Sequence, residues 1–356
     1  MMKYAADDGH IRILGRSLFM NGIRYLSWSC SAVEFVFTGT EVTAEIWTDW
    51  VLDEPWKGVF QGCMAVFVND ESEPRQRFSV DEGTRSYTVY KSDRPETVKI
   101  KLMKLSEAGF DKIGICSISA DGEIAPAPPL PRKMEFIGDS ITCGFGIEGK
   151  SGDEHFSTQT ENPWLTYAAL TARKFGADFN LISWSTIGVY SSSCNDENAV
   201  QPNDNWVMPK LYGYTDIGIE NTLGITKHTE WDFGSFEPDV ITVNLGTNDE
   251  SFTKDIPERT ENFKRAYMDF IGAVRKKNPN AHIICALGMM YKKLYPAIEE
   301  AVRDMGDSKL YALEFEQSRP DGFGSEQHPN ALTHMRAAER LSEKVAEITG
   351  WVYVSE

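Results

Sequence analysis

The chain has 356 residues, of which 53 are acidic and 36 are basic, so its formal net charge at pH 7 is −17. A surface this acidic repels phosphate backbones and anionic lipid headgroups, which argues against nucleic acid and membranes as partners. The length exceeds what one hydrophobic core usually supports and predicts two domains. No bilayer-spanning apolar stretch or signal peptide is visible, so the sequence given predicts a cytoplasmic protein, unless a leader has been removed.

The cysteines favour free thiols in a reducing compartment. They are scattered without a C-x-x-C pair, and several lie in apolar runs, as expected for buried side chains rather than disulfides or metal ligands. No spacing of histidine and acidic residues is typical of a metal site either. We therefore expect no metal. The cysteines are Cys30, Cys63, Cys116, Cys143, Cys194 and Cys285.

The first third of the chain has the pattern of an all-β domain. Segments of alternating apolar and polar residues recur up to about Ser119 without a convincing helix, which is typical of an antiparallel sandwich or jelly roll. Turn residues separate the segments. The expected strands are 33–37, 42–46, 64–68, 87–89 and 98–102, and the expected turns are 38–40, 69–71 and 81–83.

A proline-rich run then separates this part from the rest. It reads Ala125-Pro126-Ala127-Pro128-Pro129-Leu130-Pro131, and its prolines suit neither a β-ladder nor the interior of a helix. We therefore predict a β-domain over residues 1–124, a stiff linker over 125–132 and a second domain over 133–356.

In the second domain, apolar strands alternate with amphipathic helices, which predicts a parallel, doubly wound sheet of the flavodoxin-like kind. Ligands bind such sheets beyond the carboxyl ends of the strands. The strands are expected at 134–137, 179–184, 240–245, 283–287 and 310–315. Helices are expected from Asn162-Pro163 to Phe175-Gly176, from Pro257 to about Lys277, and along a final stripe made of Leu332, Met335, Ala338, Leu341, Val345 and Ile348.

Loops beyond these strands carry the residues that acyl transfer needs. Ser140 follows the first strand, Gly188 the second, Asn248 the third and His328 the fifth. Acyl transfer requires a hydroxyl that attacks, an imidazole that takes its proton, and donors for the oxyanion. We therefore predict Ser140 as the nucleophile and His328 as its base. The expected oxyanion donors are the N–H groups of Ser140 and of Gly188, which lacks a side chain that could hold substrate away, and the Asn248 amide.

Gly138-Asp139-Ser140, Gly188, Gly246-Thr247-Asn248-Asp249 and His328-Pro329 resemble the blocks of the SGNH (GDSL-type) hydrolases over about residues 133–350. The preceding β-domain, the linker and the run over 324–330 make the chain similar to carbohydrate esterase family 2. The resemblance implies a serine esterase that removes O-acetyl groups from xylan, glucomannan or derived sugars through an acetyl-enzyme, without a cofactor.

These residues also have structural interpretations. Gly138-Asp139-Ser140 can be an ordinary turn between a strand and a helix, with serine as the cap. Gly188 can be a turn glycine, and Asn248-Asp249 an Asx turn. Asp139 is expected to brace its turn rather than to take part in the reaction. Four separate blocks together favour the catalytic interpretation.

The acid of a catalytic triad is not where many SGNH enzymes have it. They place aspartate three residues before the histidine, where this chain has Ser325, and Glu326 lies one position later. Family 2 resembles this chain in that position, and the resemblance implies that a backbone carbonyl orients the histidine. We therefore predict a Ser140–His328 dyad, with Glu326 as a triad acid the alternative.

The long loops after Ser140 and after Gly188, over 146–161 and 189–231, are expected to bind something or to carry small elements of their own. The second loop contains Trp206, Tyr212 and Tyr214 among polar residues, a mixture that suits a sugar ring. The alternative is that these rings pack the loop onto its domain.

Two other functions stay open. One is an SGNH lipase or thioesterase acting on an ester that is not a sugar ester, although such a substrate should leave an exposed apolar entrance. The other is a carbohydrate-binding protein whose hydrolase scaffold has lost its activity. The sequence does not predict an oligomeric state.

Overall fold

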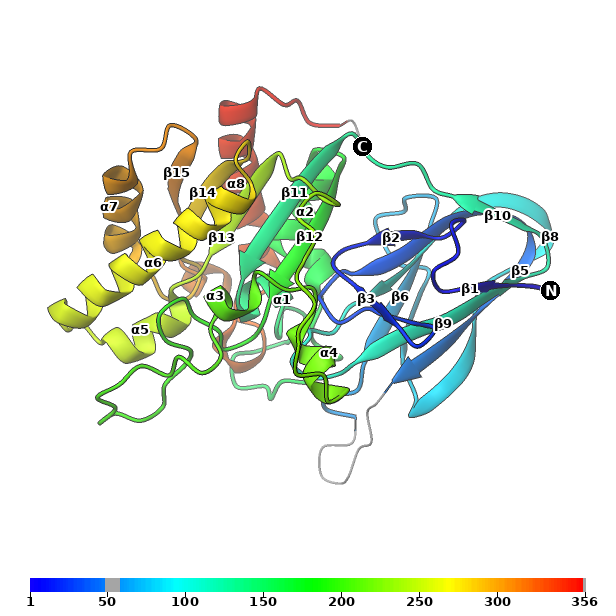
Figure 1. Ribbon diagram of the computed structural model, residues 1–356, viewed down its shortest axis with the longest axis horizontal. Coiled ribbons are helices and arrows are strands. Elements are labelled where there is room, and N and C mark those ends of the chain that lie inside the picture. The colour runs from blue at the N-terminus through cyan, green and yellow to red at the C-terminus, as the bar shows by residue number, and fades with distance from the viewer. Residues whose placement is uncertain (49–57, 355–356) are drawn as a thin grey trace. The chain divides into compact units, whose positions relative to one another are not determined.

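The computed structural model describes residues 1–48 and 58–354, and the chain forms two compact units (Figure 1). Two short segments from the predicted long loops belong to the first unit instead of the second. The β-unit comprises Met1–Pro129, Ser157–Glu161 and Thr215–Thr229, and the α/β-unit comprises Leu130–Phe156, Asn162–Tyr214 and Glu230–Glu356.

The β-unit is built on an antiparallel sheet of ten strands in the order β3-β4-β9-β5-β8-β6-β7, with β1 on β9 and with β2 and β10 on β5. The strands are β1 (Met2–Ala5), β2 (Arg12–Leu14), β3 (Leu18–Met20), β4 (Ile23–Tyr25), β5 (Ala32–Thr48), β6 (Cys63–Val68), β7 (Gln76–Ser79), β8 (Gly83–Lys104), β9 (Ile113–Ala120) and β10 (Glu123–Pro126). This unit also holds the short helix α4 (Ile217–Thr222). An all-antiparallel domain was predicted and is confirmed.

Two strands are longer than the sequence pattern predicts. β5 joins the expected strands 33–37 and 42–46, and β8 joins 87–89 and 98–102. The expected turn at 38–40 is wrong, because β5 passes through it with a shift of register between Gly39 and Glu41. A Cβ at Gly39 would lie 2.5 Å from the Phe37 ring, so glycine permits a bulge there that bends the strand without ending it.

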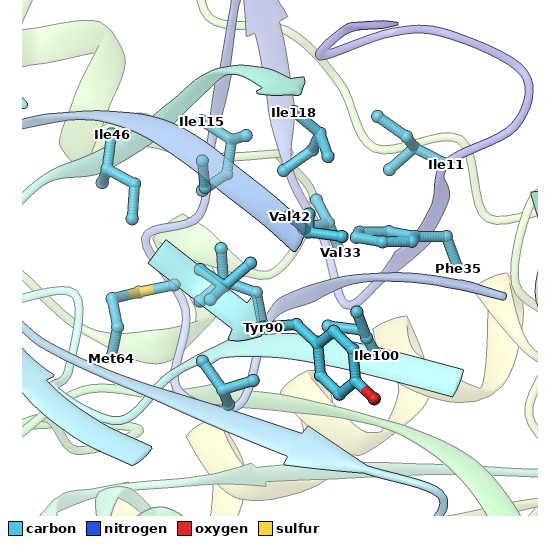
Figure 2. Close-up of a cluster of buried hydrophobic side chains, with 14 of the residues drawn as sticks. Ile11, Val33, Phe35, Val42, Ile46, Met64, Tyr90, Ile100, Ile115 and Ile118 are labelled. Carbon is cyan, nitrogen blue, oxygen red and sulfur yellow. The ribbon is translucent and has the colours of Figure 1, made fainter. Parts of the chain in front are cut away.

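The core of the β-unit is formed by the inward side chains of these strands, as Figure 2 shows for Phe35, Val42, Ile100 and Ile118. Each of these four side chains is completely buried. Burial of an aliphatic or aromatic side chain of this size contributes roughly 1.5–3 kcal/mol, so the alternating pattern supplies most of what stabilises the unit.

Part of the predicted linker is a strand. Ala125 and Pro126 end β10 and pair with Val36 and Phe35 of β5. Proline is tolerated in a sheet on an edge strand, where its missing N–H faces no partner. The prediction that the linker begins at residue 125 is therefore wrong for these two residues.

The α/β-unit contains a parallel sheet of five strands in the order β12-β11-β13-β14-β15. This is the flavodoxin-like order, as predicted, and it places the reversal of winding beside β11. The strands are β11 (Arg132–Gly138), β12 (Ala177–Ser183), β13 (Val240–Asn244), β14 (His282–Leu287) and β15 (Leu310–Glu314).

Helices cover both faces of this sheet: α2 packs against α8, and α6 against α7 (Figure 1). The α-helices are α1 (Ser140–Cys143), α2 (Tyr167–Lys174), α3 (Met208–Leu211), α5 (Thr247–Thr253), α6 (Pro257–Lys277), α7 (Tyr295–Met305) and α8 (Ala331–Thr349). Short 3₁₀ turns are η1 (Pro163–Leu165), η2 (Arg319–Asp321) and η3 (Ser325–Gln327).

The expected helices occur, with two differences. The helix expected from Asn162 is broken, because Asn162 caps only η1 and Thr166 caps α2 separately. The expected stripe of α8 is wrong at its start, since Leu332 and Met335 are 47% and 52% exposed. Here the helix buries His334 instead, whose Nδ1 accepts the Tyr167 N–H at 3.1 Å.

All six cysteines are free, and four of them are buried, as expected. Within residues 1–48 and 58–354, no helix has both the length and the apolar character needed to cross a membrane.

Candidate active site

Ser140 is the first residue of α1, directly after the end of β11. Asp139 caps this helix, because its Oδ1 accepts the Ile141 N–H at 3.0 Å. A Cβ at Gly138 would lie 2.0 Å from Thr142 Oγ1, so the turn into the helix requires glycine. Gly138 and Asp139 therefore fix the position of Ser140 at the start of α1. The residue that caps the helix is Asp139 and not the serine.

His328 contacts Ser140 from the far end of the unit's sequence. Its Nε2 lies 2.9 Å from Ser140 Oγ, and its Nδ1 lies 3.1 Å from the main-chain carbonyl oxygen of Glu326. A hydrogen on Nδ1 can be donated to that carbonyl, which leaves Nε2 to accept the serine proton. This is the geometry of the predicted dyad.

The Glu326 carboxylate is engaged elsewhere. Its Oε1 accepts the Phe156 N–H at 3.2 Å and lies 4.0 Å from His155 Nδ1. Glu326 and Gln327 both have left-handed backbone angles, with φ of 49° and 61°. Such angles are uncommon for residues other than glycine and need support from their surroundings.

That support comes from the loop after the nucleophile. Ser325 N–H donates to Gly146 O at 2.9 Å, Glu326 N–H to the carbonyl of Glu154 at 3.0 Å, and Gln327 N–H to Gly152 O at 3.2 Å. This loop is rich in glycine because its backbone passes very close to residues 325–327. A Cβ at Gly149 would lie 2.3 Å from Ser325 N, and one at Gly152 would lie 2.3 Å from the Gln327 amide. The spacing of these glycines is a signal in the sequence that our interpretation of this loop missed.

A stack of two phenylalanines supports the imidazole ring. The Phe145 ring lies against His328, with 4.3 Å between the ring centroids, and Phe156 stacks on Phe145 at 3.7 Å. Contacts of this kind restrict rotation of the ring without adding a charge. Sequence reasoning missed both residues.

Burial lowers the pKa of His328 to about 4, and the nearby Glu326 carbonyl and carboxylate oppose this only in part. An ordinary histidine has a pKa of about 6.5, so a solvated imidazole would already be largely protonated at pH 5.5. His328 is instead neutral there, and a neutral imidazole is what a general base requires.

The first prediction concerns this pKa. Ester hydrolysis should retain a substantial part of its activity at pH 5.5 and disappear only as pH falls through about 4, because His328 becomes protonated there. The acid limb of kcat/KM, which reports the free enzyme, measures this directly. Complete loss of activity by pH 5.5 would contradict the assignment of a neutral imidazole with a lowered pKa.

Two backbone N–H groups near Ser140 are free to bind an oxyanion. Among the described residues, neither the Ser140 N–H nor the Gly188 N–H donates to a protein acceptor. The reason for glycine at 188 differs from the expected one, since a Cβ there would lie 2.0 Å from Ser191 O and 2.7 Å from Asp249 Oδ2. Glycine is thus required by the packing of its own loop.

Asn248 ties the two donor segments together. Its Nδ2 lies 2.9 Å from the Ile187 carbonyl and 3.2 Å from Asp139 Oδ2, so both amide hydrogens have protein acceptors. Ile187 precedes Gly188, and Asp139 precedes Ser140. The predicted role of Asn248 as an oxyanion donor requires one of these hydrogen bonds, most readily the longer one, to yield.

The predicted substrate-binding aromatics have different surroundings. Trp206 is half-buried and packs edge-to-face against Trp184, which directly follows β12, at 5.1 Å between centroids. Tyr214 is half-buried and pairs with Glu230 in an isolated bridge. The Tyr212 hydroxyl is 2.8 Å from Glu135 Oε1 and 2.8 Å from Asn278 Nδ2, and its side chain is buried. These contacts show that Tyr212 packs its loop onto the domain, which is the alternative to substrate binding given above for these rings.

Family comparisons match both parts of the chain. The GDSL-like lipase/acylhydrolase family matches residues 136–336, and the N-terminal domain family of carbohydrate esterase 2 matches residues 13–129. Among known proteins, the cellulase/esterase CelE of Acetivibrio thermocellus is 33% identical over 336 residues, which is 91% of this chain. The match covers only 38% of that relative, so this chain corresponds to one part of it.

Solved structures of similar proteins match almost the whole chain. A family two carbohydrate esterase from Clostridium thermocellum in complex with cellohexaose is 31% identical with a TM-score of 0.81, covering 96% of this chain and 100% of that one. An acetyl xylan esterase from the rumen bacterium Butyrivibrio proteoclasticus is 26% identical with a TM-score of 0.85, covering 98% and 99%. The chain therefore belongs to the GDSL-like lipase/acylhydrolase family and, within it, to the family two carbohydrate esterases.

Proposed function

We propose that this protein removes O-acetyl groups from carbohydrates through an acetyl-enzyme on Ser140. The observation that carries the proposal is the 2.9 Å contact between Ser140 Oγ and His328 Nε2, together with two backbone N–H groups that have no acceptor within residues 1–48 and 58–354. Family membership gives the ester class. The acetyl group is supported by the relative that is an acetyl xylan esterase, and a sugar chain by the relative bound to cellohexaose.

In this mechanism His328 Nε2 takes the Ser140 proton as Oγ attacks the acetyl carbonyl carbon. The Ser140 and Gly188 N–H groups stabilise the oxyanion that forms. The imidazolium then protonates the sugar oxygen as its bond to the acetyl carbon breaks. Water attacks the acetyl-enzyme with His328 again as base, and acetate and the free serine result.

Throughout this cycle the hydrogen stays on His328 Nδ1, which donates it to the Glu326 carbonyl oxygen. A carbonyl dipole fixes the tautomer and partly stabilises the imidazolium, so a charged acid is not required for either function. For the sugar, Trp206, which packs edge-to-face against Trp184 beyond β12, is one candidate contact, and Tyr214 is a second.

The test is acetate release from acetylated xylan, acetylated glucomannan and simple sugar acetates, with a long-chain fatty acyl ester and an acyl thioester for comparison. We expect release from at least one sugar acetate and slower cleavage of the other two esters. Preference for the fatty acyl ester or the thioester would favour the lipase or thioesterase alternative. A fluorophosphonate tests the inactive scaffold, because an unreactive serine would leave the mass of the Ser140 peptide unchanged.

The second prediction is that Asn248→Ala lowers kcat by about 10²–10³, as the loss of an oxyanion donor does elsewhere, with little change in KM. Both the lost amide donor and the lost tie between Asp139 and Ile187 act on the transition state. Steady-state kinetics on one acetyl ester measure the two constants. A change confined to KM would make Asn248 a substrate-binding residue instead.

A further inference from the structure

Asp249, the residue after Asn248, binds the loop that carries Gly188. Its carboxylate is completely buried and accepts the N–H groups of residues 189, 190 and 191, which follow that glycine. Oδ1 accepts from Val189 at 3.1 Å, from Tyr190 at 2.7 Å and from Ser191 at 2.9 Å, and Oδ2 lies 3.1 Å from Val189 N.

The same carboxylate lies against Gly188 itself. The position of a Cβ on Gly188 is 2.7 Å from Asp249 Oδ2, so the carboxylate occupies the space beside that Cα. The Gly188 carbonyl is fixed by the Met208 N–H at 2.9 Å. Residues 189–191 and the Gly188 carbonyl are thus held in place, whereas the Gly188 N–H has no acceptor in the part of the chain that the structure describes.

We propose that Asp249 is a positioning residue for ester hydrolysis, whose ionised carboxylate holds residues 189–191 so that the Gly188 N–H faces the oxyanion. This inference rests on the proposed function. Donors stabilise a transition state only when they are held in place before the charge develops, and small displacements are costly. Without the carboxylate, the three N–H groups would have to find other acceptors, and the loop would move.

Burial raises the pKa of Asp249 to about 6, although the N–H groups that it accepts lower it. Asp249 also acts on Tyr267 of α6, whose pKa is raised first by burial and then by Cys285 and Asp249. Burial raises the pKa of Cys285 to about 12, so neither group titrates between pH 4 and 8. Protonation of Asp249 weakens the bonds to the loop, because charge-assisted hydrogen bonds are about twice as strong as neutral ones.

The third prediction compares Asp249→Asn with wild type. We expect kcat to fall by about 10–100-fold, less than for a donor that is removed outright, with KM unchanged. The wild-type pH profile should show a partial step near pH 6 before the loss of activity near pH 4, and the variant should lack the step. Hydrogen exchange at the amides of 189–191 should be faster in the variant.

Asp216→Asn is the matched control. Asp216 is also a buried aspartate that accepts a backbone N–H, from Ile219 at 3.0 Å, but it lies in the β-unit. The same chemical change there should leave kcat at the wild-type value. An equal loss in both variants would indicate a general effect of losing a buried carboxylate and would overturn the proposal.

Other outcomes also decide the question. A folded Asp249→Asn variant with wild-type kcat overturns the proposal, as does a wild-type profile without a step near pH 6, a result that does not depend on whether any variant folds. If wild type releases no acetate from any substrate, the proposed function fails. Amide exchange over 189–191 then still shows whether Asp249 holds the loop.

Discussion

Ser140→Ala is expected to abolish acetate release while the protein remains folded. In the subtilisin template, loss of the nucleophile costs about 10⁶ in kcat. The fold should survive, because among the described residues Ser140 Oγ bonds only to His328, and removal of one such hydrogen bond costs about 1 kcal/mol of unfolding free energy. The fourth prediction is therefore a loss of activity without a comparable loss of stability.

Initial rates on one sugar acetate and thermal unfolding measured on the same preparations test this. Ser342→Ala is the matched control, since Ser342 is also a buried serine of the α/β-unit and lies on α8. The control should keep its activity and should still react with a fluorophosphonate, whereas Ser140→Ala should do neither. Retention of most of the activity by Ser140→Ala would refute the assignment of the nucleophile.

The α/β-unit was predictable because β11, β12, β13 and β14 are largely buried on both faces of the sheet. Such strands read as short apolar runs between helices, and the rule for the carboxyl ends of parallel strands then groups Ser140, Gly188 and His328. The bent strands β5 and β8 were not predictable in this way. Whether Gly39 ends a strand or permits a bulge depends on Phe37 and on the paired strand, which the local pattern does not contain.

The residues that position the site are harder to find than those expected to react. Phe145, Phe156 and Asp249 act on residues of other segments, and each has an ordinary role when read locally. Asp249 reads as part of an Asx turn, but its carboxylate reaches residues 189–191. These roles depend on contacts between loops that are far apart in the sequence. The sequence pattern alone therefore cannot assign them.

The fifth prediction is that His328→Ala loses nearly as much activity as Ser140→Ala, about 10⁶ in kcat by the same template. No other imidazole contacts Ser140 in the part of the chain that the structure describes. Without His328 the serine proton has no acceptor, although the oxyanion donors remain. Residual activity should therefore come from those donors and from substrate binding alone.

Glu326→Gln, measured on the same acetyl ester, shows what assists that histidine. A true triad acid lost to its amide costs about 10⁴ in kcat. Here the carbonyl of residue 326, which lies 3.1 Å from His328 Nδ1, is kept in the variant, and the glutamine oxygen can still accept the Phe156 N–H. We therefore expect a loss of no more than about tenfold, since a rate factor of ten corresponds to only about 1.4 kcal/mol. A loss as deep as that of His328→Ala would show that the carboxylate, and not the carbonyl, supports the imidazolium, and the dyad would have to be abandoned for a triad.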